Sequence, residues 1–282
     1  MKTLLRKTHE AWLATLMAAF MSRNWESKHT LYEFSDILFR HLTWIENDLL
    51  KNGIDYDYDR DNIPIKVENL KVILDDIYSR MTDLELLAIN CDDEALRHRI
   101  ESDLSYMESV VKDLPDEKVE AFSVKRVYRD IQLGKEATDA LTLFLFEESY
   151  KEYELIMIYN YLKVHSDDAF LNRIFQIMID ESFFHLRSFG QMMSDMGILG
   201  VPRVIHKSLY KVENVVEFLR DGISEEEAAK EQCRELSEAV AAESEELASF
   251  FDFINHQESY HIELMKEALE YYLKKESDGQ AL

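Results

Sequence analysis

The sequence predicts an all-α protein made of two similar helical halves, and three observations support this prediction. Glycine and proline are scarce, with 7 and 3 among 282 residues, whereas sheet proteins use these residues for their many turns. Apolar residues recur at the i, i+3, i+4 and i+7 spacing of helices that bury one face. The two halves also resemble each other. Hydrophobic residues make up 46% of the chain, enough for a sizeable core.

The matching segments occur in the same order in the two halves. DILFRHLTWIENDLLKNGI at residues 36–54 matches DESFFHLRSFGQMMSDMGI at residues 180–198. The tetrapeptide KVEN at residues 66–69 recurs at residues 211–214, after a proline-containing loop in each half. SYMESVVKDL from Ser105 resembles SYHIELMKEAL from Ser259. A repeat of this length indicates duplicated domains rather than a short-period solenoid.

Periodicity predicts four main helices in each half. In the first half, residues 1–115, they lie near residues 2–23, 27–52, 66–88 and 92–114. A connecting helix is predicted within residues 116–135, near 118–133. In the second half, residues 136–277, the helices lie near residues 136–164, 168–196, 225–242 and 245–277. Residues 278–282 form a tail.

Candidate caps mark the starts of three helices in the second half. Ser224 with Glu227 has the spacing of a capping box for helix 225–242. Asp167 or Ser166 can cap helix 168–196, and Ser244 can cap the last helix.

Charge and cysteine content limit the partners and the compartment. The net charge of −24 repels nucleic acid and anionic membrane surfaces. Cys91 and Cys233 indicate neither a disulfide framework nor a CxxC metal motif, so a reducing, cytoplasmic location is expected. The N-terminal stretch is interrupted by His9 and Glu10, which disfavours a signal peptide. No run approaches the roughly 18 apolar residues of a membrane span.

Two predicted helices carry glutamate and histidine within otherwise apolar stripes. In the last helix, Glu258 and His261 are three residues apart and share a face. On helix 168–196, Glu181 and His185 are four apart and share a face as well. Burial of a lone carboxylate is costly unless it is paired or bound to a cation. These pairs therefore predict a metal site inside the second half.

The other two helices of that half are each expected to supply a carboxylate. Glu148 follows an apolar stripe on helix 136–164, and antiparallel packing would place it at the level of Glu181. The same mirror argument about a turn near residues 242–244 points to Glu227 or Glu231 on helix 225–242, and the sequence leaves that choice open.

With these residues, the second half resembles the ferritin-like di-iron carboxylate superfamily, most of all its rubrerythrin-like branch. The resemblance implies tandem ferritin-like four-helix bundles, the second of which binds two metal ions, usually iron and sometimes manganese. It implies that the glutamates bridge or chelate the ions and that each histidine binds one. The sequence departs from the family in having three residues, rather than two, between Glu181 and His185.

The first half is predicted to keep the fold but lack the metal ligands. The positions of Glu148, Glu181, Glu258 and His261 align with four apolar residues of the first half, Leu4, Ile37, Leu104 and Met107. His41, however, aligns with His185. The second histidine therefore either binds a metal or packs as its counterpart does.

These features favour a di-metal, expected di-iron, carboxylate oxidoreductase that acts on dioxygen, peroxide or a small organic substrate. One alternative is an iron-binding or buffering protein without turnover. Another is a non-catalytic structural or interaction protein with a buried polar network. The first half can act as the bundle partner that a homodimer would otherwise provide, although the sequence leaves a homodimer open.

Overall fold

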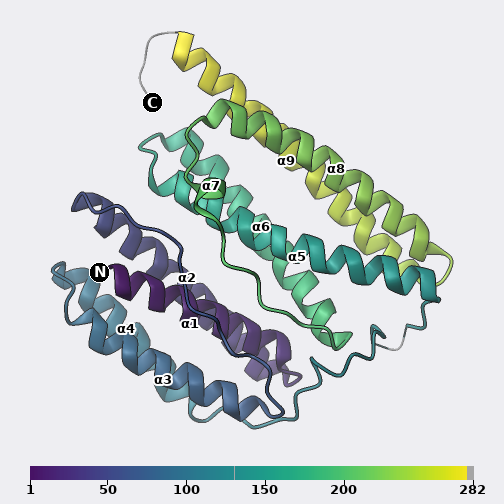
Figure 1. Cartoon of the computed structure of the whole chain (residues 1–282), viewed down its shortest axis with the longest axis horizontal. Helices are drawn as coiled ribbons and strands as arrows, with labels where there is room; N and C mark the ends of the chain where they lie inside the picture. The colour runs from purple at the N-terminus through teal and green to yellow at the C-terminus, as the bar shows by residue number, and fades with distance from the viewer. Residues whose placement is uncertain (130, 278–282) are drawn as a thin grey trace. The chain divides into compact units, whose positions relative to one another are not determined.

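The computed structural model describes residues 1–129 and 131–277, and this described part contains helices and no strand (Figure 1). The all-α prediction is therefore confirmed. The chain divides into two compact units. The first unit comprises Met1–Val124 with Gly197–Ile205, and the second comprises Lys125–Met196 with His206–Leu282.

The first unit is built from four helices, α1 (Lys2–Met21), α2 (Trp25–Lys51), α3 (Leu70–Ala88) and α4 (Glu94–Val111). Helix α1 packs against α2 and α3, and α4 packs against α3 and α2. Every residue of α1 from Thr8 to Met21 is buried. A helix that is buried all round lies within a core, and α1 does so from Thr8 to Met21.

The second unit holds α5 (Lys135–Val164), α6 (Ala169–Asp195), the single turn α7 (Lys207–Tyr210), α8 (Val215–Ala241) and α9 (Glu245–Ser277). Helix α5 packs against α6 and α8, and α9 packs against α8 and α6. In Figure 1, α8 and α9 run side by side over much of their length. The four long helices thus repeat the pairing of α1 to α4.

The predicted connecting helix within residues 116–135 is wrong. The described residues of that segment form turns, and part of it runs beside the start of α3, where Asn69 and Lys118 form an isolated antiparallel bridge. Three non-glycine residues there have positive φ, a conformation that a right-handed helix excludes: Val124, Arg126 and Arg129.

The predicted boundary between the halves also needs correction, because residues 197–205 belong to the first unit rather than to the second half. Leu199 N–H donates to the Ala121 carbonyl, and Arg60 donates to the Pro202 carbonyl. Gly197 has φ +73°, and a Cβ there would lie 2.3 Å from Ser123 Oγ. Glycine is therefore required at the point where the chain passes between units.

Helix α8 begins ten residues before its predicted start. Asn214 caps it by accepting a hydrogen bond from the Glu217 N–H, and Ser224 instead bonds the Arg220 carbonyl inside the helix. The predicted capping box is wrong because Ser224 and Glu227 both lie within continuous helix. The predicted Ser244 cap is confirmed by a 3.2 Å bond from Leu247 N–H.

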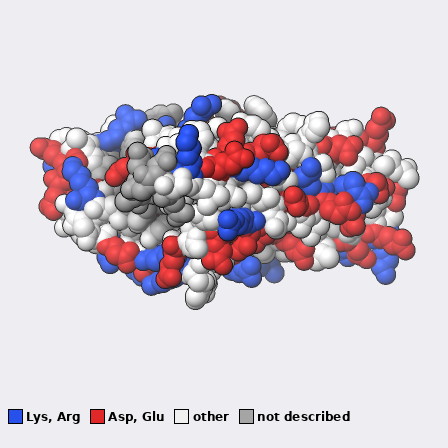
Figure 2. Space-filling view, turned by 90° about the horizontal axis from the view of Figure 1, so that it is seen from above, with Lys and Arg blue, Asp and Glu red and all other residues white. Residues whose placement is uncertain are grey.

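The surface carries charges of both signs. On the face drawn in Figure 2, acidic and basic side chains lie interspersed rather than gathered into one field of a single sign.

Among the described helices, none is long and apolar enough to cross a bilayer. Both cysteines are free thiols and buried. The predicted tail, residues 278–282, lies outside the described residues.

Asp168, rather than the predicted Asp167 or Ser166, caps α6 and also ties that helix to α9. Its carboxylate accepts hydrogen bonds from the N–H groups of Phe170 and Leu171, from the Tyr271 hydroxyl at 2.9 Å, and from the Lys275 ammonium. Desolvation opposes the charge, but these donors, Lys275 foremost, lower the pKa of Asp168 to about 2.

Asp168→Ala is expected to lower the free energy of unfolding by about 1–2 kcal/mol at neutral pH, as loss of a helix cap does. Because the folded-state pKa is depressed, the charge-dependent part is fully present above about pH 4. It is lost as the pH falls toward about 2. Urea unfolding followed by circular dichroism between pH 7 and pH 3 measures the difference. Asp168→Asn keeps a capping oxygen without the charge and is the matched control. A difference between wild type and Asp168→Ala that does not change with pH would contradict this account.

Candidate metal centre

A cluster of carboxylates and imidazoles lies inside the second unit, where α5, α6, α8 and α9 face one another. Each of these residues is at most 4% exposed. Such groups are almost never buried unless they are paired or bound to a cation. The members are Glu152 from α5, His185 from α6, Glu226 from α8, and Glu258 and His261 from α9.

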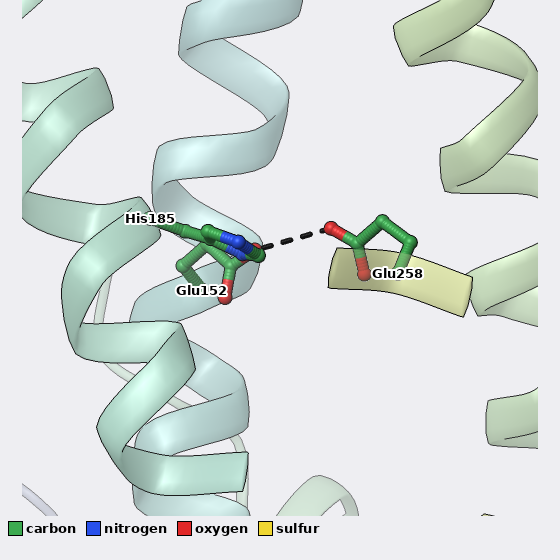
Figure 3. Close-up of side chains that lie close together, drawn as sticks. All are labelled: Glu152, His185 and Glu258. Atoms are coloured by element: carbon green, nitrogen blue, oxygen red, sulfur yellow. Dashed lines mark hydrogen bonds and ion pairs between the residues drawn. The ribbon is translucent and has the colours of Figure 1, made fainter. Parts of the chain in front are cut away.

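Glu258 lies at the centre of the cluster, and each of its oxygens faces a different histidine. Oε1 is 3.6 Å from His185 Nδ1, and Oε2 is 3.0 Å from His261 Nδ1. Figure 3 shows Glu258 reaching from α9 toward His185 and Glu152. A carboxylate placed between two histidines in this way offers one oxygen to each of two ligand sets.

Each histidine has a second carboxylate beside the same nitrogen. His185 Nδ1 is 3.0 Å from Glu152 Oε1, and His261 Nδ1 is 3.7 Å from Glu226 Oε2. The cluster therefore consists of two sets that share Glu258. In each set, ligand atoms of all three residues lie within 4.8 Å of one another.

The outer nitrogen of His185 is held by an amide. His185 Nε2 lies 3.1 Å from Gln257 Oε1, and because an amide oxygen only accepts, Nε2 is the donor. This bond fixes the ring orientation and, in the neutral imidazole, leaves the Nδ1 lone pair facing Glu152 and Glu258. Ligating histidines are commonly oriented in this way by a partner on the other ring nitrogen.

Glu152 Oε2, a buried oxygen of the cluster, has no hydrogen-bond partner. His261 Nε2, by contrast, lies 2.6 Å from Glu181 Oε2 and forms an ion pair with it. Unsatisfied buried polar atoms are rare and call for an explanation such as a bound ion. Oxygen and imidazole donors together suit Fe, Mn and Zn.

The cluster holds protons at neutral pH when no cation is bound. Burial and the adjacent Glu226 raise the pKa of Glu258 to about 8. Burial disfavours charge on His185, but Glu152 and Glu258 together raise its pKa to about 9. Burial likewise opposes charge on His261, yet the surrounding carboxylates raise its pKa to about 12. Metal binding would displace such protons, as it does wherever ligands must be deprotonated.

Four of the seven predicted site residues lie together. Glu258, His261 and His185 belong to the two sets, and Glu181 lies against the outer nitrogen of His261. Glu148 is buried nearby, 3.8 Å from the Lys151 ammonium, but is in neither set. Burial raises its pKa to about 7.

On α5 it is Glu152, one turn beyond Glu148, that enters the cluster. Mirror symmetry about the loop predicts Glu148 at the level of Glu181. The observed contact instead joins His185 to Glu152, which lies one turn nearer that loop than Glu148. Both glutamates continue the same apolar stripe, so periodicity alone could not separate them.

The two residues predicted on α8 do not reach the cluster. Glu227 and Glu231 are exposed, and Glu231 is paired with Arg234. Glu226 occupies the inner position instead. The sequence held a signal for Glu226, because it is an acidic residue at a buried position of α8. Its neighbours on that buried stripe include Leu219, Ala229, Cys233, Leu236 and Val240.

The first unit repeats one contact of this centre. His41 Nε2 lies 3.0 Å from Asp103 Oδ2, and the alignment of the halves places these residues opposite His185 and Gln257. Thr8 aligns with Glu152. Among the described residues of the first unit, no set of three such ligands converges.

Comparison with known proteins gives no family for this chain. No family model matches it. Neither curated proteins nor solved structures match it either. The functional inference therefore depends on the ligand set itself.

Proposed function

We propose that the second unit binds two divalent transition-metal ions, iron or manganese, and acts as a di-metal carboxylate oxidoreductase. The observation that carries the proposal is the pair of buried ligand sets that share Glu258. One ion is assigned to Glu152, His185 and Glu258. The other is assigned to Glu226, Glu258 and His261, with Glu181 beside it.

The arrangement of donors along the helices supports a ferritin-like bundle. Two helices, α5 and α8, each supply a glutamate, and the other two, α6 and α9, each supply a glutamate with a histidine. Di-iron carboxylate bundles distribute their ligands in this way. The same helix pairing in the first unit supports two tandem bundles, of which the first lacks the ligands.

Charge balance also supports two divalent ions. Five carboxylates lie in or against the centre: Glu148, Glu152, Glu181, Glu226 and Glu258. One ammonium, that of Lys151, lies at their edge, 3.8 Å from Glu148. With both histidines neutral, two divalent ions and this lysine offset the five negative charges. A buried site is most stable when its charges are compensated in this way.

Two Fe(II) ions bound there would supply the two electrons that, with two protons, reduce one hydrogen peroxide to two waters. The residues of the two sets would hold the ions, their burial excludes bulk water, and Gln257 orients His185. The oxidant is accordingly peroxide or dioxygen.

One alternative is a metal-free polar network that only stabilises the bundle. Its support is the direct contact between His261 and Glu258 at 3.0 Å. The unsatisfied Glu152 Oε2 favours the metal-binding proposal instead, because a network that serves stability alone would satisfy it.

The test is metal loading of the full chain followed by one oxidation. After anaerobic incubation with Fe(II) or Mn(II) and desalting, elemental analysis is expected to find about two ions per chain. One equivalent of peroxide is then expected to oxidise both Fe(II) ions, as measured by Mössbauer spectroscopy. Failure to retain either metal would overturn the proposal and favour the polar network. Retention of iron that peroxide does not oxidise would favour storage or buffering.

A further inference from the structure

A cavity of about 500 Å³ adjoins the proposed metal centre. It is lined by residues of α5, α7 and α8 and by Met265 of α9. Glu226 of the centre is one of the lining residues of α8. Its size falls within the range of small-molecule pockets. The cavity and the inner ligands therefore share a residue.

One wall of the cavity carries four acidic residues at four-residue spacing: Glu213, Glu217, Asp221 and Glu225. Glu213 precedes α8, whereas Glu217, Asp221 and Glu225 lie within it, where like charges at this spacing oppose helix formation. Lys151 and Lys211 also line the cavity, and because the ammonium of Lys151 faces Glu148 of the centre, the four acidic residues outnumber the remaining lysine, Lys211. The wall away from the centre is thus predominantly negative and complementary to a cation.

Tyr159 is a second and independent pointer to a ligand. This residue lines the cavity, is 1% exposed, and its hydroxyl has no hydrogen-bond partner. Its ring is held by Phe175 and Phe218, each with a centroid 6.3 Å away. A buried hydroxyl without a partner is uncommon in a folded protein, and a polar group bound in the cavity would satisfy it.

The remaining lining favours an organic body over a bare metal ion. The apolar side chains that line the cavity are Leu155, Ile158, Leu209, Val212, Phe218 and Met265. A path for metal ions needs neither this volume nor these side chains. Ligand pockets typically combine such an apolar lining with a few polar groups.

We propose that this cavity binds a small primary amine, with its ammonium between the acidic row of α8 and the Tyr159 hydroxyl and its apolar body beside Met265. The amine is thereby placed next to Glu226. That it is the substrate of the metal centre rests on the proposed function, whereas the binding itself does not.

Gly222 keeps the cavity open. It lies inside α8, where glycine is less stable than alanine, and a Cβ there would lie 3.1 Å from both Sδ and Cε of Met265. A larger side chain at this position must therefore displace Met265 or project into the cavity. Gly222→Leu accordingly tests the location without changing any proposed ligand.

The experiment is isothermal titration of the full chain, metal-free and Mn(II)-loaded, with hexylamine, hexan-1-ol and hexanoate. Hexylamine is expected to bind with a dissociation constant on the order of a millimolar, as suits a ligand of this size. It is expected to bind roughly tenfold more tightly than the alcohol, because the acidic row attracts the ammonium. Hexanoate is expected to bind most weakly.

Three variants locate the site. Glu217→Gln combined with Asp221→Asn is expected to lower amine affinity about tenfold while leaving hexan-1-ol binding unchanged. Gly222→Leu, with circular dichroism to confirm its fold, is expected to abolish binding of both. Glu227→Gln, on the exposed side of the same helix, is expected to change neither.

The outcomes separate this proposal from the proposed function. Hexanoate binding as tightly as hexylamine, or amine binding that survives Gly222→Leu, overturns the amine site. Metal retention without any amine binding, in either metal state, also overturns it and leaves the metal centre standing. Amine binding that is weakened by the Glu217→Gln and Asp221→Asn pair and by Gly222→Leu, but not by Glu227→Gln, in a chain that retains no metal supports the amine site and overturns the metal centre alone.

Discussion

Glu258→Gln is expected to lose both metal ions together, from about two per chain to none. Each oxygen of Glu258 faces a different histidine, so one substitution removes a ligand from both sets. Glu226→Gln removes a ligand from only one set and is expected to reduce the content to about one ion. Elemental analysis after anaerobic loading measures both variants.

Two features make this comparison decisive. With its pKa raised to about 8, Glu258 is mostly protonated in the metal-free chain at pH 7. Glutamine is therefore a neutral analogue of similar shape, and the metal-free stability is expected to change little. Glu227 follows Glu226 along α8 and is exposed. Glu227→Gln is therefore expected to keep both ions. Two ions retained by Glu258→Gln, or one lost by Glu227→Gln, would refute this assignment of ligands.

Mn(II) is expected to raise the melting temperature of the second unit by roughly 15–30 °C, because two sites are filled. Metal at about a thousand times its dissociation constant contributes about 4 kcal/mol per site. Each kcal/mol shifts the melting temperature of a domain of this size by about 2–4 °C. Relief of repulsion among the buried carboxylates acts in the same direction. Differential scanning calorimetry with and without Mn(II), and after addition of EDTA, measures the shift.

The expected shift is confined to the second unit, because the described residues of the first unit offer no such ligand set. Glu258→Gln is the control and is expected to show no shift. A shift of the same size in that variant would place the stabilising ions elsewhere, for example among the exposed acidic residues.

Helical periodicity predicted the eight long helices, but not every boundary. It works where one face of a helix is buried, as in α2 and α6. It failed for residues 116–135 because left-handed backbone at Val124 and Arg126 leaves no mark on the apolar pattern. It also failed at the start of α8, because the helix begins at Val215 and continues through Gly222, which lies beside Met265.

The candidate site was predicted best where two donors share one helix. The pair Glu258 and His261 places a carboxylate and an imidazole on one face regardless of how the helices pack. Single donors depend on register between helices instead. A shift of one turn along α5 exchanges Glu148 for Glu152, and a shift of one residue on α8 exchanges Glu227 for Glu226. Sequence periodicity does not determine such shifts.

The contact between His41 and Asp103 orients a histidine of the first unit without the metal-ligand role proposed for His185. In the first unit the contact joins α2 to α4 at 3.0 Å, and burial lowers the pKa of His41 despite the adjacent carboxylate. A neutral, oriented imidazole is therefore present without a ligand set around it. The first unit is consequently a natural scaffold for grafting, in which Thr8, Leu104 and Met107 occupy the aligned positions of Glu152, Glu258 and His261. Its histidine would be the one donor that a designer need not introduce.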